Sequence, residues 1–147
     1  MLPGTETAEL ALNAFLFEEF LLRDRNADRL RSKLKALPQK KALLHGHCHQ
    51  KAFAAMPAVE DALRLVPELE VQTIESSCCG MAGSFGYDAS HYEVSMRMGE
   101  LSLLPRVRSE PDALVVADGT SCRHQIRDGA SREAVHVARV LEAALAA

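Results

Sequence analysis

The sequence lacks a surplus of charge of either sign. Its 147 residues carry 17 basic against 20 acidic side chains, a formal net charge of -3. This balance provides no electrostatic footprint for nucleic acid or for an anionic membrane surface. Long hydrophobic runs are also missing: residues 11–17, the longest uncharged apolar stretch near the start, fall far short of the roughly 20 residues that span a bilayer. We therefore expect neither a nucleic-acid-binding protein nor a transmembrane one.

A secretory signal is missing as well, because the first residues have neither a basic region nor an apolar one after it. The expected location is therefore cytoplasmic. Cysteine is scarce, with four residues in all, and in a reducing compartment so few seldom form a disulfide framework. A disulfide between the neighbours Cys78 and Cys79 would close a strained ring. Metal binding or thiol chemistry is therefore the leading question for function.

The hydrophobic pattern alternates between strand and helix after an N-terminal helical segment, residues 1–40, in which residues 5–23 have a helical pattern. With 48% hydrophobic residues, the chain suits one core of ordinary size. Strands are expected at residues 41–46, 71–75, 112–118 and 134–136, and helices at residues 50–66, 90–109 and 137–146. Such alternation predicts an α/β three-layer domain with a short, mainly parallel sheet of about four strands.

The cysteines follow the predicted strands in order. Cys48 comes after the first strand, Cys78 and Cys79 after the second, and Cys122 after the third, while His136 ends the fourth. Ligands of open parallel sheets bind in the crevice at the carboxyl ends of the strands. We therefore expect the four thiols to converge on one edge of the sheet, in metal-binding loops.

The neighbours of the thiols support metal binding. Each cysteine lies just before or at a predicted helix start, where unpaired N–H groups and the helix dipole favour an anion, and the thiolate is the form that ligates metal. Lys51 and Arg123 are close in sequence and are expected to offset part of the thiolate charge. Gly80 is expected to let the backbone approach a cluster or a helix closely.

Two kinds of metal centre suit these thiols. Zinc takes four N or S ligands in a tetrahedron. Two adjacent thiolates fit a polynuclear iron–sulfur cluster more easily, because each can bind a different iron, and soft sulfur donors suit both choices. The residues alone leave this choice open. A thiol enzyme that uses Cys78 or Cys79 with a nearby histidine ranks below both.

Three stretches together resemble a known family. They are residues 47–51 (His-Cys-His-Gln-Lys), 78–87 (Cys-Cys-Gly-Met-Ala-Gly-Ser-Phe-Gly-Tyr) and 118–125 (Asp-Gly-Thr-Ser-Cys-Arg-His-Gln). In this order they resemble the cysteine-rich CCG domain of the heterodisulfide reductase B subunit and of the glycolate oxidase iron–sulfur subunit. They look most like the C-terminal domain of FAD-linked oxidoreductases. The resemblance covers residues 41–147.

The resemblance implies an electron-transfer domain or subunit with no turnover of its own. It implies an iron–sulfur cluster, such as a 4Fe-4S cluster, or zinc, held by Cys48, Cys78, Cys79 and Cys122. FAD is then expected on a partner, with flavin-binding and ferredoxin-like domains or subunits completing an oxidoreductase that acts on a 2-hydroxy acid such as glycolate or lactate. The alternative is a zinc-binding structural or interaction domain of such a complex, without a redox role.

One departure from the family pattern keeps the ligand set open. The heterodisulfide reductase pattern ends in Cys-x-x-Cys, whereas Gln125 occupies the second position here. Four thiolates, a cluster completed by a histidine, and a single zinc all remain possible. The histidines that are candidates to complete the site are those around Cys48 (His45, His47 and His49), His124 and His136, although most loop histidines only form hydrogen bonds.

Overall fold

The computed structural model describes residues 4–146 and confirms the α/β three-layer fold. Its four strands form one sheet in the order β2-β1-β3-β4, and every neighbouring pair is parallel. The strands are β1 (Lys41–His45), β2 (Glu70–Thr73), β3 (Leu114–Ala117) and β4 (Ala134–Val135). Each lies within, or overlaps, the range that the sequence predicts.

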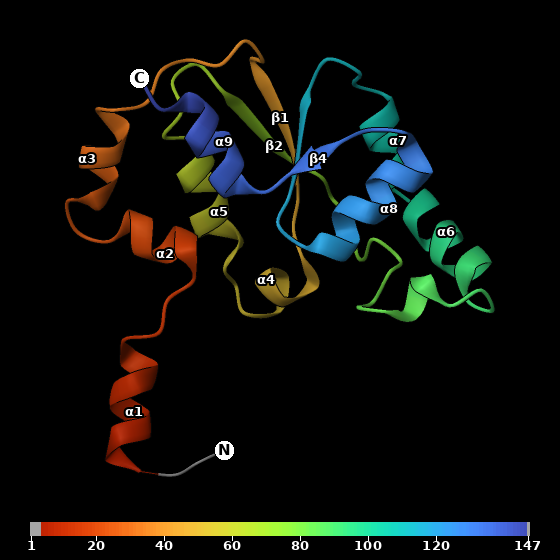
Figure 1. The fold of residues 1–147 in the computed structure, drawn as a ribbon, viewed down its shortest axis with the longest axis horizontal. Helices are drawn as coiled ribbons and strands as arrows, with labels where there is room; N and C mark the ends of the chain where they lie inside the picture. Colours follow the sequence, from red (N-terminus) through yellow and green to blue (C-terminus); the bar gives the residue numbers. More distant parts are fainter. Residues whose placement is uncertain (1–3, 147) are drawn as a thin grey trace.

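Helices cover both faces of this sheet (Figure 1). The helices of the described residues are α1 (Thr5–Leu12), α2 (Phe17–Leu22), α3 (Asn26–Arg31), α4 (Cys48–Ala52), α5 (Met56–Leu63), α6 (Tyr92–Glu100), α7 (Leu103–Arg108), α8 (Thr120–Ala130) and α9 (Val137–Ala144), with a short 3-10 helix η1 (Phe85–Tyr87). Within residues 4–146, no helix combines the length and apolar character needed to cross a membrane.

The core has two halves because successive side chains of a strand point to opposite faces. From β1, Ala42 and Leu44 pack with α5 and α9 on one face, where residues of α2 and α3 join them. Leu43 packs on the other face with residues of α7 and α8. All three strand residues are fully buried. The division of the chain at residue 40, into an N-terminal helical segment and a cysteine-rich α/β domain, stays a prediction.

The N-terminal helix predicted over residues 5–23 is wrong as a single element, because the chain leaves the helical conformation at residues 13–16. The first piece, α1, buries none of its residues and stands apart from the sheet (Figure 1). Leu10 and Leu12 of α1 are 70% and 77% exposed. The apolar side chains of α1 therefore do not place this helix in the core.

Two further predicted helices, residues 50–66 and 90–109, are each divided in two. The first begins earlier, at Cys48, and breaks at Ala54, which has a left-handed φ of 54°. The second breaks at Ser102 (φ -156°, ψ -45°), and Pro105 lies in the first turn of α7. Proline is tolerated there because the first N–H groups of a helix have no intrahelical partner.

The strand order creates a crevice between β1 and β3. After β1 the chain passes through α4 and α5 on one face to reach β2 at the edge. It then returns through α6 and α7 on the other face to β3, on the far side of β1. The chain leaves β1 toward the face covered by α5 and leaves β3, through α8, toward the opposite face. The carboxyl ends of β1 and β3 therefore form a topological switch point, where ligands of such folds bind.

A pair of leucine substitutions tests this assignment of the core. Leu43→Ala removes a fully buried side chain of the central strand and should lower the free energy of unfolding by about 2–5 kcal/mol. Leu12→Ala in α1, the matched control, should change it by less than about 0.5 kcal/mol. Urea unfolding of both variants measures the difference, and equal losses would contradict the assignment.

Candidate metal centre

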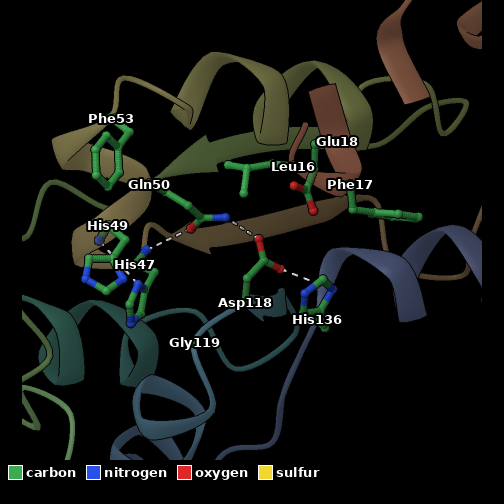
Figure 2. A pocket seen from close by; sticks show the side chains of 10 residues that line it. All are labelled: Leu16, Phe17, Glu18, His47, His49, Gln50, Phe53, Asp118, Gly119 and His136. Carbon is green, nitrogen blue, oxygen red and sulfur yellow. Dashed lines mark hydrogen bonds and ion pairs between the residues drawn. The ribbon is translucent and has the colours of Figure 1, made fainter. Parts of the chain in front are cut away.

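A pocket of about 530 Å³ opens at the switch point between β1 and β3 (Figure 2). Its apolar walls are formed by Leu16, Phe17 and Phe53, and its polar part includes Glu18, Asp118 and His136. His47 and Gly119 also line it. These last two lie close to Cys122, because a Cβ at Gly119 would come within 2.3 Å of His47 Cδ2 and 2.9 Å of Cys122 Sγ. The pocket therefore adjoins the thiols.

The four cysteines lie at the carboxyl edge of the sheet and form two pairs. Cys48 begins α4 and its Sγ is 3.8 Å from that of Cys78, in the loop after β2. Cys79 and Cys122, the latter in the first turn of α8, form a second, buried pair. Each member of this pair is only 2% exposed, whereas Cys48 is exposed and Cys78 half-buried.

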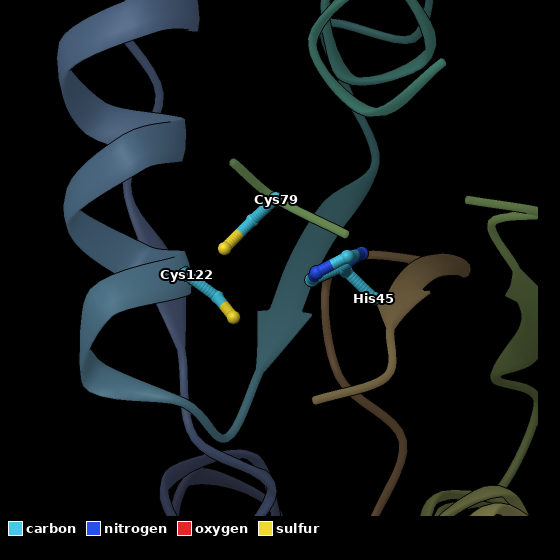
Figure 3. Close-up of side chains that lie close together, drawn as sticks. All are labelled: His45, Cys79 and Cys122. Carbon is cyan, nitrogen blue, oxygen red and sulfur yellow. The ribbon is translucent and has the colours of Figure 1, made fainter. Parts of the chain in front are cut away.

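His45 joins the buried pair (Figure 3). One ligating atom from each of His45, Cys79 and Cys122 lies within 4.8 Å of the other two. Ser76 Oγ, 2.8 Å from Nδ1 of His45, orients the ring, and its Nε2 is buried with no hydrogen-bond partner among the described residues. A buried polar atom without a partner is costly, so this nitrogen suits a metal ligand.

The electrostatics of the buried pair also favour a cation. Cys122, His45 and the backbone N–H of Met81 together hold the pKa of Cys79 well below its usual range, although burial opposes this. The contact with Cys79, and then burial, raises the pKa of Cys122. The contact thus favours the ionised form of Cys79 and the protonated form of Cys122. A metal ion would displace the remaining proton.

The exposed pair is linked electrostatically to the buried one. Burial, and then the neighbouring Cys78, raises the pKa of Cys48, while Lys51 lowers it. Charges on Cys48 and Cys78 also raise the pKa of Cys122. The two pairs therefore lie within electrostatic reach of each other.

Two of the residues predicted to support a cofactor bind backbone carbonyls. The ammonium of Lys51 donates to Ser76 O and, at 3.3 Å, to Ser77 O, which ties α4 to the loop before Cys78. The guanidinium of Arg123 donates to the carbonyls of Ala117 and Asp118 at the end of β3. Their contribution to cofactor binding stays a prediction.

Gly80, the third residue predicted to support a cofactor, lets the loop after β2 pack closely against α6. Its φ is +97°, and a Cβ there would come within 2.1 Å of the Ser95 carbonyl oxygen. Its N–H donates to Cys78 Sγ at 3.3 Å, which is a typical support for a thiolate. Gln125, at the position of the missing fifth cysteine, is buried and donates to Ser95 O and Oγ.

The other candidate histidines have separate environments. His47 is the N-cap of α4 and accepts from the N–H of His49, and burial lowers its pKa. His124 interacts with the Tyr87 hydroxyl. His136 is the N-cap of α9 and lies in the pocket beside Asp118. Only His45 among them joins the cysteine group of the described residues.

Comparison with known proteins relates the chain to segments of larger dehydrogenases. It is 33% identical over 113 residues to one subunit of the anaerobic glycerol-3-phosphate dehydrogenase of Escherichia coli K12, covering 77% of this chain and 28% of that relative. It is 32% identical over 83 residues to the D-2-hydroxyglutarate dehydrogenase of the same strain, covering 56% of this chain and 8% of that enzyme.

The D-2-hydroxyglutarate dehydrogenase of Pantoea ananatis is similarly related, with 31% identity over 85 residues, 57% of this chain and 8% of the enzyme. The chain thus spans less than a third of the length of these relatives. No protein-family model and no solved structure matches it.

Thiol labelling tests the two-pair geometry. In metal-free protein we expect iodoacetamide to modify Cys48 and Cys78 first, because Cys79 and Cys122 are buried and react only after local opening. Mass spectrometry of digested samples assigns the modified residues. Labelling of Cys79 and Cys48 at equal rates in folded protein would contradict the buried pair.

Two glycine variants test the loop. Gly80→Ala and Gly83→Ala both place a side chain at a positive φ, but only at Gly80 does the new Cβ meet another atom within 4 Å. We expect Gly83→Ala to lower the free energy of unfolding by about 1–2 kcal/mol. Gly80→Ala should lower it by at least about 2 kcal/mol more, because its Cβ also collides with Ser95, and should reduce the amount of metal that the protein binds. Calorimetry and metal analysis measure both effects, and equal behaviour of the two variants would count against the close approach.

Proposed function

We propose that this chain holds an iron–sulfur cluster through Cys48, Cys78, Cys79 and Cys122 and transfers electrons as part of a flavin-dependent dehydrogenase. The observation that carries the proposal is the gathering of four thiols, as the pairs Cys48–Cys78 and Cys79–Cys122, from the three segments that follow β1, β2 and β3. Thiolates are the usual ligands of such clusters. A bound cluster would supply one-electron transfer, which neither the thiols nor the neighbouring side chains can provide.

The residues around the thiols fit an electron-transfer site better than a site of catalysis. Cys48 is exposed and Cys78 half-buried, which places one side of the centre at the surface, where a redox partner can approach. The opposite side is packed in the core by Cys79 and Cys122. The N–H of Gly80, directed at Cys78 Sγ, would help to set the potential.

The substrate belongs to a partner in this proposal. The names of the relatives specify glycerol-3-phosphate in one case and D-2-hydroxyglutarate in the other. We favour a 2-hydroxy acid, which is oxidised at an FAD on another domain or subunit, with ferredoxin-like domains or subunits completing the chain of carriers. The present chain would then be a non-catalytic segment of that oxidoreductase.

Zinc is the second candidate because of His45. The group of His45, Cys79 and Cys122 offers one nitrogen and two sulfur ligands, a donor set that is typical of structural zinc. Zinc has no redox chemistry, so in this case the metal would only hold the loops together.

Metal and sulfide analysis of protein purified without oxygen distinguishes the two candidates. We expect several irons per chain with acid-labile sulfide and a visible absorption band that bleaches on reduction. Cys48→Ser, Cys78→Ser, Cys79→Ser and Cys122→Ser should each lose most of the iron, because each removes a thiolate ligand. Ser77→Ala, an exposed neighbour of Cys78, is the matched control and should retain it. One zinc per chain without sulfide would overturn the electron-transfer proposal.

A further inference from the structure

The pocket beside the thiols contains a second group of ligating side chains that the thiol centre does not use. Glu18 comes from α2, Asp118 follows β3, and His136 is the N-cap of α9 (Figure 2). One ligating atom of each lies within 4.8 Å of the other two. Ligands about 2.1 Å from a common ion lie up to about 4.2 Å from one another, so this spacing is close to that of a coordination sphere.

Glu18 is the residue that points to a ligand. It is only 4% exposed, and its carboxylate faces Asp118 and His136 across the pocket (Figure 2). Within residues 4–146, no other residue donates a hydrogen bond to its carboxyl group. Burial, and the facing Asp118, raise the pKa of this carboxyl, while its own backbone N–H lowers it. Buried carboxylates are ordinarily paired with a cation or coordinate a metal, and here the neighbouring side chain is a second carboxylate.

Asp118 and His136 are held in place, and both present acceptors. Asp118 Oδ2 accepts from Gln50 Nε2 at 2.6 Å, and Oδ1 accepts from the N–H of Val137 at 2.9 Å. Nδ1 of His136 accepts from the N–H of Ala138 at 3.1 Å and lies 3.4 Å from Asp118 Oδ1. The carboxyl groups of Glu18 and Asp118 and the imidazole of His136 thus face one another. The hydrogen bond from Ala138 uses the lone pair of Nδ1, so Nε2 is the ring nitrogen left to bind a cation.

We propose that Glu18, Asp118 and His136 bind a divalent cation of the hard to borderline class, for which Mn²⁺ is the probe. Two carboxylates and one imidazole are the donors that such ions prefer, whereas the thiols nearby select softer metals. The cation would offset the mutual repulsion of the two facing carboxyl groups. This site is independent of the metal held by the cysteines and of the electron-transfer proposal.

Titration with Mn²⁺, followed by the EPR signal of the free ion, tests the site. The protein is used as purified, with its thiol centre loaded, because Mn²⁺ competes poorly for thiolates. We expect one Mn²⁺ per chain, and at least a tenfold weaker affinity in Glu18→Gln, which keeps the shape of the side chain. Glu9→Gln, the same change on the exposed helix α1, is the matched control and should bind like the parent.

A second variant and a second readout keep a folding defect apart from a loss of ligands. Asparagine is a good N-cap residue, so His136→Asn should preserve the start of α9 while removing the imidazole, and should also bind Mn²⁺ at least tenfold more weakly. Mn²⁺ should raise the melting temperature of the parent and of Glu9→Gln, and leave that of the two site variants unchanged. No Mn²⁺ bound by the folded parent, or equal binding by Glu18→Gln, would overturn the proposal.

Discussion

The parallel pairing of β1 with β3 is the constraint on which the rest of the molecule depends. His45 lies opposite Ala117 in this register, so the two buried strands end together. Beyond these residues the chain leaves toward opposite faces of the sheet, which opens the crevice. Cys48 follows β1 by three residues and Cys122 follows β3 by five. The backbone hydrogen bonds of the two strands therefore fix where the segments that carry these thiols begin.

Two groups of ligating side chains lie at this end of the sheet and differ in their donor atoms. On one side lie Cys79, Cys122 and His45, with sulfur and nitrogen; on the other lie Glu18, Asp118 and His136, with oxygen and nitrogen. Burial raises the free energy of each group unless a cation compensates it. Because thiolates prefer soft metal ions and carboxylates prefer hard ones, the two groups would not compete for the same ion. A side chain at position 119 would collide with His47 and Cys122, so Gly119 lets the backbone after Asp118 pass close to this thiol.

The sequence predicts the sheet and the edge at which the cysteines gather, because buried parallel strands have a strong apolar pattern and Cys48, Cys78 and Cys122 each follow one. Helix boundaries are harder to predict: the break at Ser102 depends on backbone dihedral angles that no periodicity reports. Lys51 and Arg123 are expected near the thiols, but their carbonyl partners come from segments distant in the chain or from tight local turns. Glu18 carries no sequence signal, since only folding brings α2 against the end of β3. Whether the four cysteines ligate a metal stays a prediction.

The central claim is that the four cysteines hold one polynuclear iron centre in a segment of a larger dehydrogenase. X-ray absorption at the iron and zinc edges of protein purified without oxygen tests it most directly, because it reports both the element and its ligands. We expect iron with a first shell of sulfur and a clear iron–iron scattering contribution. Zinc with mixed sulfur and nitrogen ligands, and no iron, would contradict the claim.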